Sequence, residues 1–367
     1  MTRVEEFNAK WERLRGLFEE RKLGGILLAR RSNFAWLTSG GQNHVLAASE
    51  WGAGALVVTP EKAYVVANNI ESARLLEEET AGLPIEPIAY PWESESEAKP
   101  RLIAKVLGKA KLGADGPGGD EDLSSAIMRL RHPLLPPEME RYRALGKEAE
   151  PILSQVCRDL RPGMTEYQLA ARLAGDYLEK GMDAAVRLVA FDERIEKYRH
   201  PIPTEKKLEA RAMVVLCARR AGLIVNLTRL VQFKVIDADL RRRHDAVCRV
   251  DAVLNLASRP GVTLGSIFRR GMEQYAAEGF PEEWRHHHQG GTTGYEGRDV
   301  KGTPTCEEVL AAPTAVAWNP SIRGTKSEDT FLVTEEGIEN LTESKDWPQV
   351  KAVTPLGILH RCDILER

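Results

Sequence analysis

The chain has 367 residues, of which 43% are hydrophobic and 29% are charged. This balance predicts a globular protein whose length allows two or three domains, each with its own core. The formal charge is −3, and both signs are mixed along the chain. No basic face for a polyanion is therefore predicted, and we expect no nucleic-acid partner.

The five cysteines are widely spaced, and no Cys-x-x-Cys pair occurs. Neither a disulfide framework nor a zinc ribbon is predicted, and a reducing cytoplasm is the expected location. The N-terminus is charged from its third residue and lacks the apolar core of a secretion signal. No apolar run approaches the roughly 18 residues of a membrane span, so we expect no membrane partner.

The N-terminal part of the chain combines helical and strand-like patterns. Apolar residues recur every three or four positions from Val4 to Phe18, which predicts an amphipathic helix. Three short apolar runs, bounded by Gly, Pro or charged residues, predict strands. They are residues 24–29, 54–59 and 63–68. Pro and Gly then cluster over 95–140, which predicts loops and a domain boundary near residue 135.

The second part opens with a helical pattern from Glu138 to Leu160, and Thr165 with Gln168 has the form of a capping box for the next helix. The later patterns predict strands at 212–219 and 223–233, helices at 237–258 and 263–278, and strands at 314–318 and 330–334. The predicted fold class is α+β. A small α/β domain covers 1–135, and a domain with an antiparallel sheet flanked by helices covers 136–367.

Four segments of the second domain carry the informative side chains. They are HPIPTEKKLEARAMVVL, GLIVNLTRLV, HHHQGGTTGYEG and WNPSIRGTKSEDTFLVTEEG. In order and spacing they resemble the pita-bread hydrolases of the peptidase M24 family, which include aminopeptidase P, prolidase, methionine aminopeptidase and creatinase. SNFAWLTSG at 32–40 is similar to the N-terminal domain of the creatinase and prolidase branch. The resemblance implies such an N-terminal domain followed by a pita-bread domain.

In metal-dependent members of that family, two Asp, one His and two Glu hold a pair of divalent ions. Carried over by position, these ligands fall at Cys217 (Val215 by strict spacing), Asn226, Gly291, Asn319 and Glu328. No Asp or Glu lies between Glu209 and Asp237, so a shift of register cannot supply the two Asp. Because one carboxylate cannot offset the repulsion between two dications, we expect no dinuclear site and no metal cofactor.

The resemblance gives His200 the position of the histidine that faces the substrate, and that acts as general base in metal-free creatinase. The catalytic candidates are His200, Glu328, His287 and His288, with Glu328 as an anchor for water or a cationic group. If the histidine run is a strand, His286 and His288 share one face and His287 takes the other.

Several polar residues are expected to bind substrate. They are Asn226, Asn319, Thr292, Thr293 and Tyr295, together with Arg30 and Arg31. The two arginines are included because creatinase-like enzymes bind a substrate carboxylate with arginines of the partner subunit's N-terminal domain. The resemblance also implies a homodimer.

The main hypothesis is a metal-independent, creatinase-like hydrolase of an amide or amidine C–N bond in a small molecule or short peptide. A non-catalytic pseudo-peptidase that binds a ligand, and a metallo-aminopeptidase with rearranged ligands, remain alternatives. A single metal held by His288, His200, Glu328 or Cys217 is also chemically acceptable. As a nucleophile Cys217 would need a lowered pKa, so a small buried side chain is the interpretation that we favour.

Overall fold

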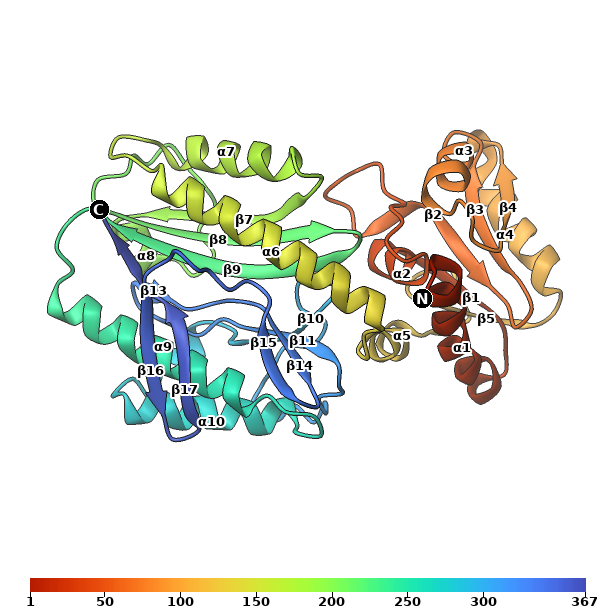
Figure 1. The fold of residues 1–367 in the computed structure, drawn as a ribbon. Helices are drawn as coiled ribbons and strands as arrows, with labels where there is room; N and C mark the ends of the chain where they lie inside the picture. Colours follow the sequence, from red (N-terminus) through yellow and green to blue (C-terminus); the bar gives the residue numbers. More distant parts are fainter. The chain divides into compact units, whose positions relative to one another are not determined.

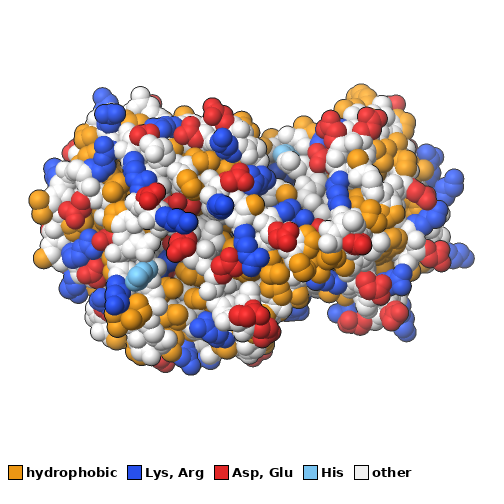
Figure 2. All heavy atoms as spheres, in the orientation of Figure 1, with side chains coloured by type: hydrophobic (Ala, Val, Ile, Leu, Met, Phe, Trp, Pro, Cys, Tyr) orange, Lys and Arg blue, Asp and Glu red, His pale blue; other side chains and the backbone are white.

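The computed structural model describes residues 1–367 and divides into two compact units. The N-terminal unit comprises Met1–Met139 and Ala221–Leu223, and the C-terminal unit comprises Glu140–Arg220 and Ile224–Arg367. Acidic and basic side chains are interspersed over the face drawn in Figure 2, without a large area of one sign. No helix combines the length and the apolar character that crossing a bilayer requires.

The N-terminal unit is built on a six-stranded mixed sheet in the order β4-β3-β2-β1-β5-β6 (Figure 1). The strands are β1 (Leu23–Arg30), β2 (Trp51–Val58), β3 (Ala63–Asn68), β4 (Ile85–Tyr90), β5 (Lys111–Ala114) and β6 (Glu121–Asp122). The helices are α1 (Arg3–Arg21), α2 (Arg31–Leu37), α3 (Ser72–Arg74), η1 (Leu75–Glu79), η2 (Trp92–Ser94), α4 (Glu95–Leu107) and α5 (Ser124–Arg131).

Apolar residues of this sheet alternate between two faces, and helices cover both. Leu27 of β1 packs with Ala98 and Ile103 of α4. Ile26, the preceding residue, is fully buried and points to the opposite face, where α1 contacts β1. Helix α4 corrects the prediction of loops in this region, because it continues through Pro100. A proline removes one backbone donor, but here the helix still buries an apolar face.

The C-terminal unit contains two four-stranded sheets. The first has the order β18-β9-β8-β7, and the second has the order β10-β11-β14-β15. Their strands are β7 (Asp183–Phe191), β8 (Arg211–Arg220), β9 (Leu223–Gln232), β18 (Ile364–Glu366), β10 (Gly290–Thr293), β11 (Thr314–Trp318), β14 (Phe331–Thr334) and β15 (Gly337–Asn340). Two hairpins are formed by β12 (Ser321–Ile322) with β13 (Thr325–Lys326), and by β16 (Gln349–Thr354) with β17 (Gly357–Cys362).

Five α-helices and one 3-10 turn complete this unit. They are α6 (Pro136–Arg158), α7 (Glu166–Leu178), α8 (Glu193–Lys197), α9 (Ala238–Ala257), α10 (Leu264–Ala277) and η3 (Glu283–His286). The predicted capping box is present, since Thr165 and Gln168 each bind the other's backbone N–H. Helices α9 and α10 bury Leu254 and Ile267 against Val316 of β11. The predicted α+β class is confirmed, with helices packed on antiparallel strands.

Candidate active site

Three histidines from two separate segments of the C-terminal unit lie together. His200 follows α8, whereas His287 and His288 lie between η3 and β10. The Nε2 atoms of His200 and His287 are 3.1 Å apart, and ring nitrogens of all three residues lie within 4.8 Å of one another. His287 is buried, His288 is partly buried and His200 is exposed. The histidine cluster therefore reaches solvent through His200.

The two consecutive histidines lie on the same side of the chain, which the sequence did not predict. The segment is not a strand, because η3 ends at His286 and β10 begins at Gly290. The ring centroids of His287 and His288 are 4.5 Å apart, and His286 is exposed. The alternation was expected only for a strand, so it does not apply to this segment.

Burial and nearby cations lower the pKa of all three imidazoles. Desolvation is the largest cause for each, and it lowers the pKa of His288 to about 4. The positive charge of Lys326 acts in the same direction on His200 and His287. At neutral pH the three rings are uncharged, so each has a lone pair that can accept a proton.

The carboxylate of Glu328 lies between two cationic side chains. Oε1 is 2.7 Å from Nη2 of Arg298, and Oε2 is 2.8 Å from Nζ of Lys326. The hydroxyl of Thr228 also donates to Oε2, at 2.7 Å. Glu328 is 2% exposed, yet these cations lower its pKa to about 2 in spite of its burial. The carboxylate is therefore charged and already carries protein partners on both of its oxygens.

Asn226 and Cys217 form a neutral network on strands β9 and β8. The Cys217 thiol donates to Oδ1 of Asn226 at 3.0 Å, and the Asn226 amide donates to the Thr293 hydroxyl at 3.0 Å. The Thr293 hydroxyl in turn donates to the carbonyl of Glu296. Burial raises the pKa of the Cys217 thiol to about 12, which leaves it protonated. The polar groups of these side chains are thus engaged with one another.

Strand β10 has no room for a side chain at Gly291. Its φ angle is +149°, in a region that L-residues rarely adopt, and a Cβ atom would lie 1.9 Å from the carbonyl oxygen of Val300. The neighbouring Thr292 hydroxyl accepts a hydrogen bond from the backbone N–H of Val300 at 3.0 Å. These contacts hold the strand close to residues 299–302.

The remaining predicted binding residues of this unit are buried. Asn319 donates its backbone N–H to the carbonyl of Gln289, while its side-chain Oδ1 is buried without a hydrogen-bond partner. Tyr295 is 3% exposed. Of the predicted binding residues in this unit, Asn319 thus keeps an unused buried acceptor.

Arg30 and Arg31 lie in the N-terminal unit and have local partners there. The Arg30 guanidinium pairs with Glu50 at 2.9 Å and stacks over the Trp51 ring. Arg31 donates to the backbone carbonyls of Ala47 and Ser49. These contacts tie both arginines to the segment that precedes β2.

A comparison with families of known proteins matches this chain over most of the C-terminal unit. The model of metallopeptidase family M24 covers residues 140–335, which is more than half of the chain. The chain belongs to metallopeptidase family M24. The family expected from the four sequence segments is thereby confirmed.

Curated relatives of this M24 protein are distant. An uncharacterized peptidase of Staphylococcus saprophyticus is 25% identical over 230 residues, which cover 60% of this chain and 65% of the relative. An uncharacterized peptidase of Staphylococcus haemolyticus is 25% identical over 235 residues, with the same coverage. The chain thus spans just under two thirds of the length of the relatives that it matches.

Solved structures share the fold of the whole M24 chain. The Xaa-Pro dipeptidase from Bacillus anthracis has a TM-score of 0.76 at 20% identity and covers 98% of this chain and 100% of its own. The prolidase from Pyrococcus horikoshii has a TM-score of 0.77 at 17% identity, and the match covers 92% of this chain and 99% of the prolidase. The N-terminal domain of a FACT complex subunit from chickpea has a TM-score of 0.73 at 11% identity, and the match covers 93% of this chain and 96% of that domain. The expected prolidase-like, pita-bread architecture is confirmed.

Three residues next to Glu328 were not among the sequence candidates. Lys326 stands where the family segment R-I-E-D-T has its Arg, and Thr228 stands in the T-R part of the strand that carries Asn226. The alignment with the family segments could therefore have identified Lys326 and Thr228 as site candidates. Arg298 lies in the loop after β10, and no periodicity or spacing in the sequence indicated that this loop returns to Glu328.

Proposed function

We propose that this M24 protein is a hydrolase of a C–N bond in a small molecule and that it works without the paired metal ions of its family. The observation that carries this proposal is the Glu328 carboxylate between Arg298 and Lys326. Two side-chain cations already neutralise the one carboxylate that remains at the aligned ligand positions. A divalent ion beside it would meet their repulsion.

The other aligned positions support the same conclusion. The Asn226 amide and the Cys217 thiol bind each other, and that thiol is protonated. Gly291 stands at the position of the histidine ligand, and the carbonyl of Val300 excludes a side chain there. The donor set and the backbone therefore do not fit a dinuclear centre.

The proposed chemistry is acid–base catalysis by the histidine cluster. His200 is exposed and uncharged, so it accepts a proton from the attacking water while the water oxygen bonds to the substrate carbon. The Nε2–Nε2 contact with buried His287 orients the His200 ring, while burial lowers the pKa of His287 so far that the proton stays on His200. The C–N bond then breaks, and the proton passes to the leaving nitrogen. Glu328 keeps Lys326 and Arg298 in place.

A second candidate is a hydrolase with one metal ion, and the geometry of the histidine cluster favours it. His200, His287 and His288 each offer a ring nitrogen within 4.8 Å of the others, and three neutral imidazoles suit zinc. This ligand set differs from the one expected from the sequence. His287 takes part, whereas Cys217 and Glu328 are engaged elsewhere.

Metal analysis combined with activity assays tests these candidates. The purified protein is assayed on ureas, amidines and N-acyl amino acids, with and without EDTA, and its metal content is measured. We expect less than one equivalent of metal, turnover that EDTA does not affect, and a loss of about 100-fold or more in His200→Ala. The exposed His286→Ala is the matched control and should keep full activity.

Other outcomes would select a different function. Two equivalents of Mn, Co or Zn with activity abolished by EDTA would restore the metallopeptidase interpretation. One equivalent that is lost in His288→Ala would support the single-metal candidate. No turnover of any substrate, with a ligand found by thermal shift, would make the protein a binding protein on this fold.

A further inference from the structure

The hairpin of β16 and β17 leaves one edge of β17 without a strand beside it. The two strands form a sheet of their own, and Thr354 pairs with Gly357 across the turn at 355–356. In such a hairpin the main-chain groups of alternate residues point toward the partner strand and away from it. Those of Leu359 therefore point to β16. Those of Ile358 and His360 point away from β16 and make no main-chain hydrogen bond.

A hollow of 360 Å³ lies along this free edge of β17. Three consecutive residues, Ile358 to His360, all line it. Successive side chains of a strand point to opposite faces, so a hollow that lies over one face would be lined by alternate residues only. The opposite wall includes Asn340 at the end of β15, which is the edge strand of its own sheet. Two sheet edges thus line one hollow, whose volume lies within the range of ligand sites.

This edge lacks the features that usually prevent strands from pairing. Edge strands of soluble proteins are commonly protected by a lysine, a proline or a covering segment. On β16, Lys351 lies opposite His360, so that strand carries a lysine. On β17, Ile358 lines the hollow and is 53% exposed. The free edge of β17 is therefore suited to pairing with a further strand.

The hollow also carries one negative charge without a partner. Glu343 is exposed and forms no ion pair, whereas Asp329 is already held by two buried arginines. No lysine or arginine lines this hollow. An adjoining hollow of 580 Å³ shares Glu343 and adds side chains of both signs, so the acidic character belongs to the part beside β17. A cationic side chain next to Glu343 would complement it.

We infer that the free edge of β17 binds an extended peptide segment of a partner protein, which adds a strand along β17 and places a Lys or Arg beside Glu343. The partner's main chain pairs with Ile358 and His360 and supplies most of the affinity, while Glu343 selects the side chain. This inference goes beyond the proposed hydrolysis, since no residue of the histidine cluster lines the hollow. The hairpin also lies outside residues 140–335, which match the family model.

Fluorescence anisotropy with synthetic peptides tests the inference on the full-length protein. The probe is labelled acetyl-Val-Thr-Lys-Val-Thr-amide, and two analogues are compared with it. One has Glu in place of Lys, and the other has N-methyl groups on alternate residues, which block pairing along one edge but keep every side chain. We expect the N-methylated peptide to bind about tenfold or more weakly and the Glu peptide about threefold or more weakly.

Hydrogen exchange measured by NMR locates the bound peptide. In the free protein the amides of Ile358 and His360 should exchange faster than that of Leu359, because only Leu359 donates to β16. With the Lys peptide at about ten times its Kd, exchange at one or both of the two free-edge amides should slow about tenfold. The N-methylated peptide at the same concentration should leave their exchange unchanged.

Variants of the hollow make the assignment specific. Ile358→Lys should weaken binding of the Lys peptide about tenfold or more, because it places a charge and a long side chain at the pairing edge. Val353→Lys is the matched control: it adds the same charge opposite Ile358, on a residue that is 57% exposed and does not line the hollow. It should bind within a few-fold of wild type. Glu343→Lys should reverse the preference, so that the Glu peptide binds more tightly than the Lys peptide.

Several results would overturn the inference. They are the absence of saturable binding of the Lys peptide up to about 1 mM, equal affinity for its N-methylated analogue, and unchanged affinity in Ile358→Lys. Self-association that Ile358→Lys abolishes, seen by analytical ultracentrifugation, would assign the edge to a second copy of this chain instead. If Ile358→Lys fails to fold, the N-methylated peptide and the exchange rates of wild type still decide. No measurement here involves hydrolysis, so the outcome is independent of the proposed function.

Discussion

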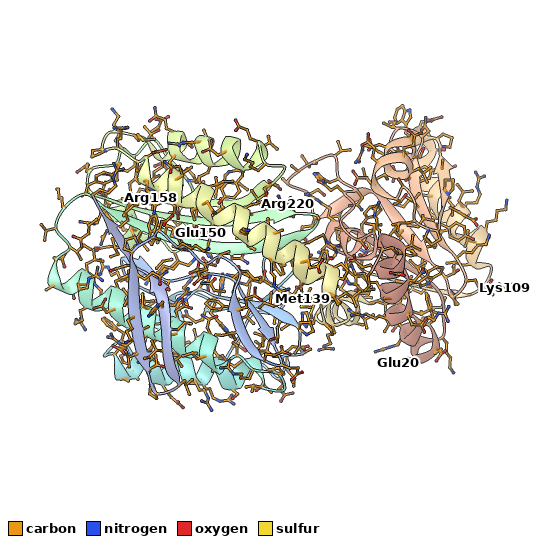
Figure 3. All side chains as sticks on the ribbon, viewed as in Figure 1. Glu20, Lys109, Met139, Glu150, Arg158 and Arg220 are labelled. Atoms are coloured by element: carbon orange, nitrogen blue, oxygen red, sulfur yellow. The ribbon has the colours of Figure 1, made fainter.

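Glu328 and Asp329 are consecutive residues whose carboxylates have different surroundings. Asp329 belongs to a deep ionic network: Arg229 lies 3.0 Å from Oδ1 and Arg361 lies 2.8 Å from Oδ2. Arg361 also pairs with Asp251 at 2.6 Å, and Arg229 pairs with Glu150, labelled on α6 in Figure 3. Every charge of this network has a partner of opposite sign.

The Glu328 group has the opposite ratio of charges and a different position. One carboxylate serves two cations, and the neighbouring histidine cluster reaches solvent. The deep network has three carboxylates for two guanidinium groups, and it joins α6, α9, β9 and β17, so it stabilises one packing of the fold. The two groups thus differ in the sign of their excess charge and in their access to solvent.

Breaking the deep network should have the largest effect. Arg361→Met leaves Asp251 and Asp329 short of a buried partner, and we expect a loss of about 3–5 kcal/mol in the free energy of unfolding. Urea denaturation of the full chain measures it. The exposed pair of Arg143 with Glu339 supplies the control, because Arg143→Met should change stability by less than about 1 kcal/mol. If the deep network did not stabilise the fold, Arg361→Met and Arg143→Met would lose the same free energy of unfolding.

Acid should destabilise the fold around the buried His244. His244 is fully buried, and desolvation lowers its pKa to about 4, with Asp363 and Arg241 as its charged neighbours. Between about pH 6.5 and 4, His244 binds a proton in the unfolded chain but not in the folded chain. The free energy of unfolding therefore falls as the pH is lowered through this interval. The loss is on the order of 1.4 kcal/mol for each unit by which the pKa is lowered.

The control for this pH dependence is His244→Gln, which lacks the titrating ring. Its free energy of unfolding, measured by urea denaturation at several pH values, should fall less steeply than that of wild type over the same interval. Parallel curves for the two proteins would assign the acid sensitivity to other groups.

Removing the carboxylate of the site should cost less stability than breaking the deep network. Glu328→Gln leaves Lys326 and Arg298 without their ion-pair partner, and we expect a loss of about 2 kcal/mol in the free energy of unfolding. Urea denaturation measures this loss. An unchanged free energy of unfolding would show that the two cations do not depend on Glu328.

The smallest effect should come from Cys217. Its thiol is protonated and donates to Asn226, and a hydroxyl can make the same contact. Cys217→Ser should therefore retain activity within about threefold and change stability by about 1 kcal/mol or less. A complete loss of turnover, with the fold intact by circular dichroism, would instead identify a nucleophilic thiol.

Regular periodicity explains which elements could be predicted. Strands β8 and β9 and helices α9 and α10 carry continuous apolar patterns, and Thr165 with Gln168 forms a local cap. Strand β7 was missed because only the last part of Asp183–Phe191 is continuously buried. Helix α4 was missed because Pro100 outweighed its apolar face in the sequence.

The candidate site was predictable where the family segments supplied a position. That alignment gave His200, His287 and Glu328, but no local rule states that residues 87 positions apart share a hydrogen bond. Arg298 was missed because its partner is fixed by the path of a loop and not by a repeat. The ion pairs of Glu328 with Lys326 and Arg298 became visible only in the structure.

Gly291 stands at the position that the family resemblance gives to a histidine ligand, and the backbone there resists such a side chain. Exchanging side chains one at a time will not rebuild a histidine ligand there, because the obstacle is the Val300 carbonyl and a backbone angle of +149°. Strand β10 would first have to separate from the segment that carries Val300 and Lys301. Under the proposed function, rebuilding the paired metal site of the family on this scaffold therefore requires a change of main chain, and natural point mutation meets the same barrier.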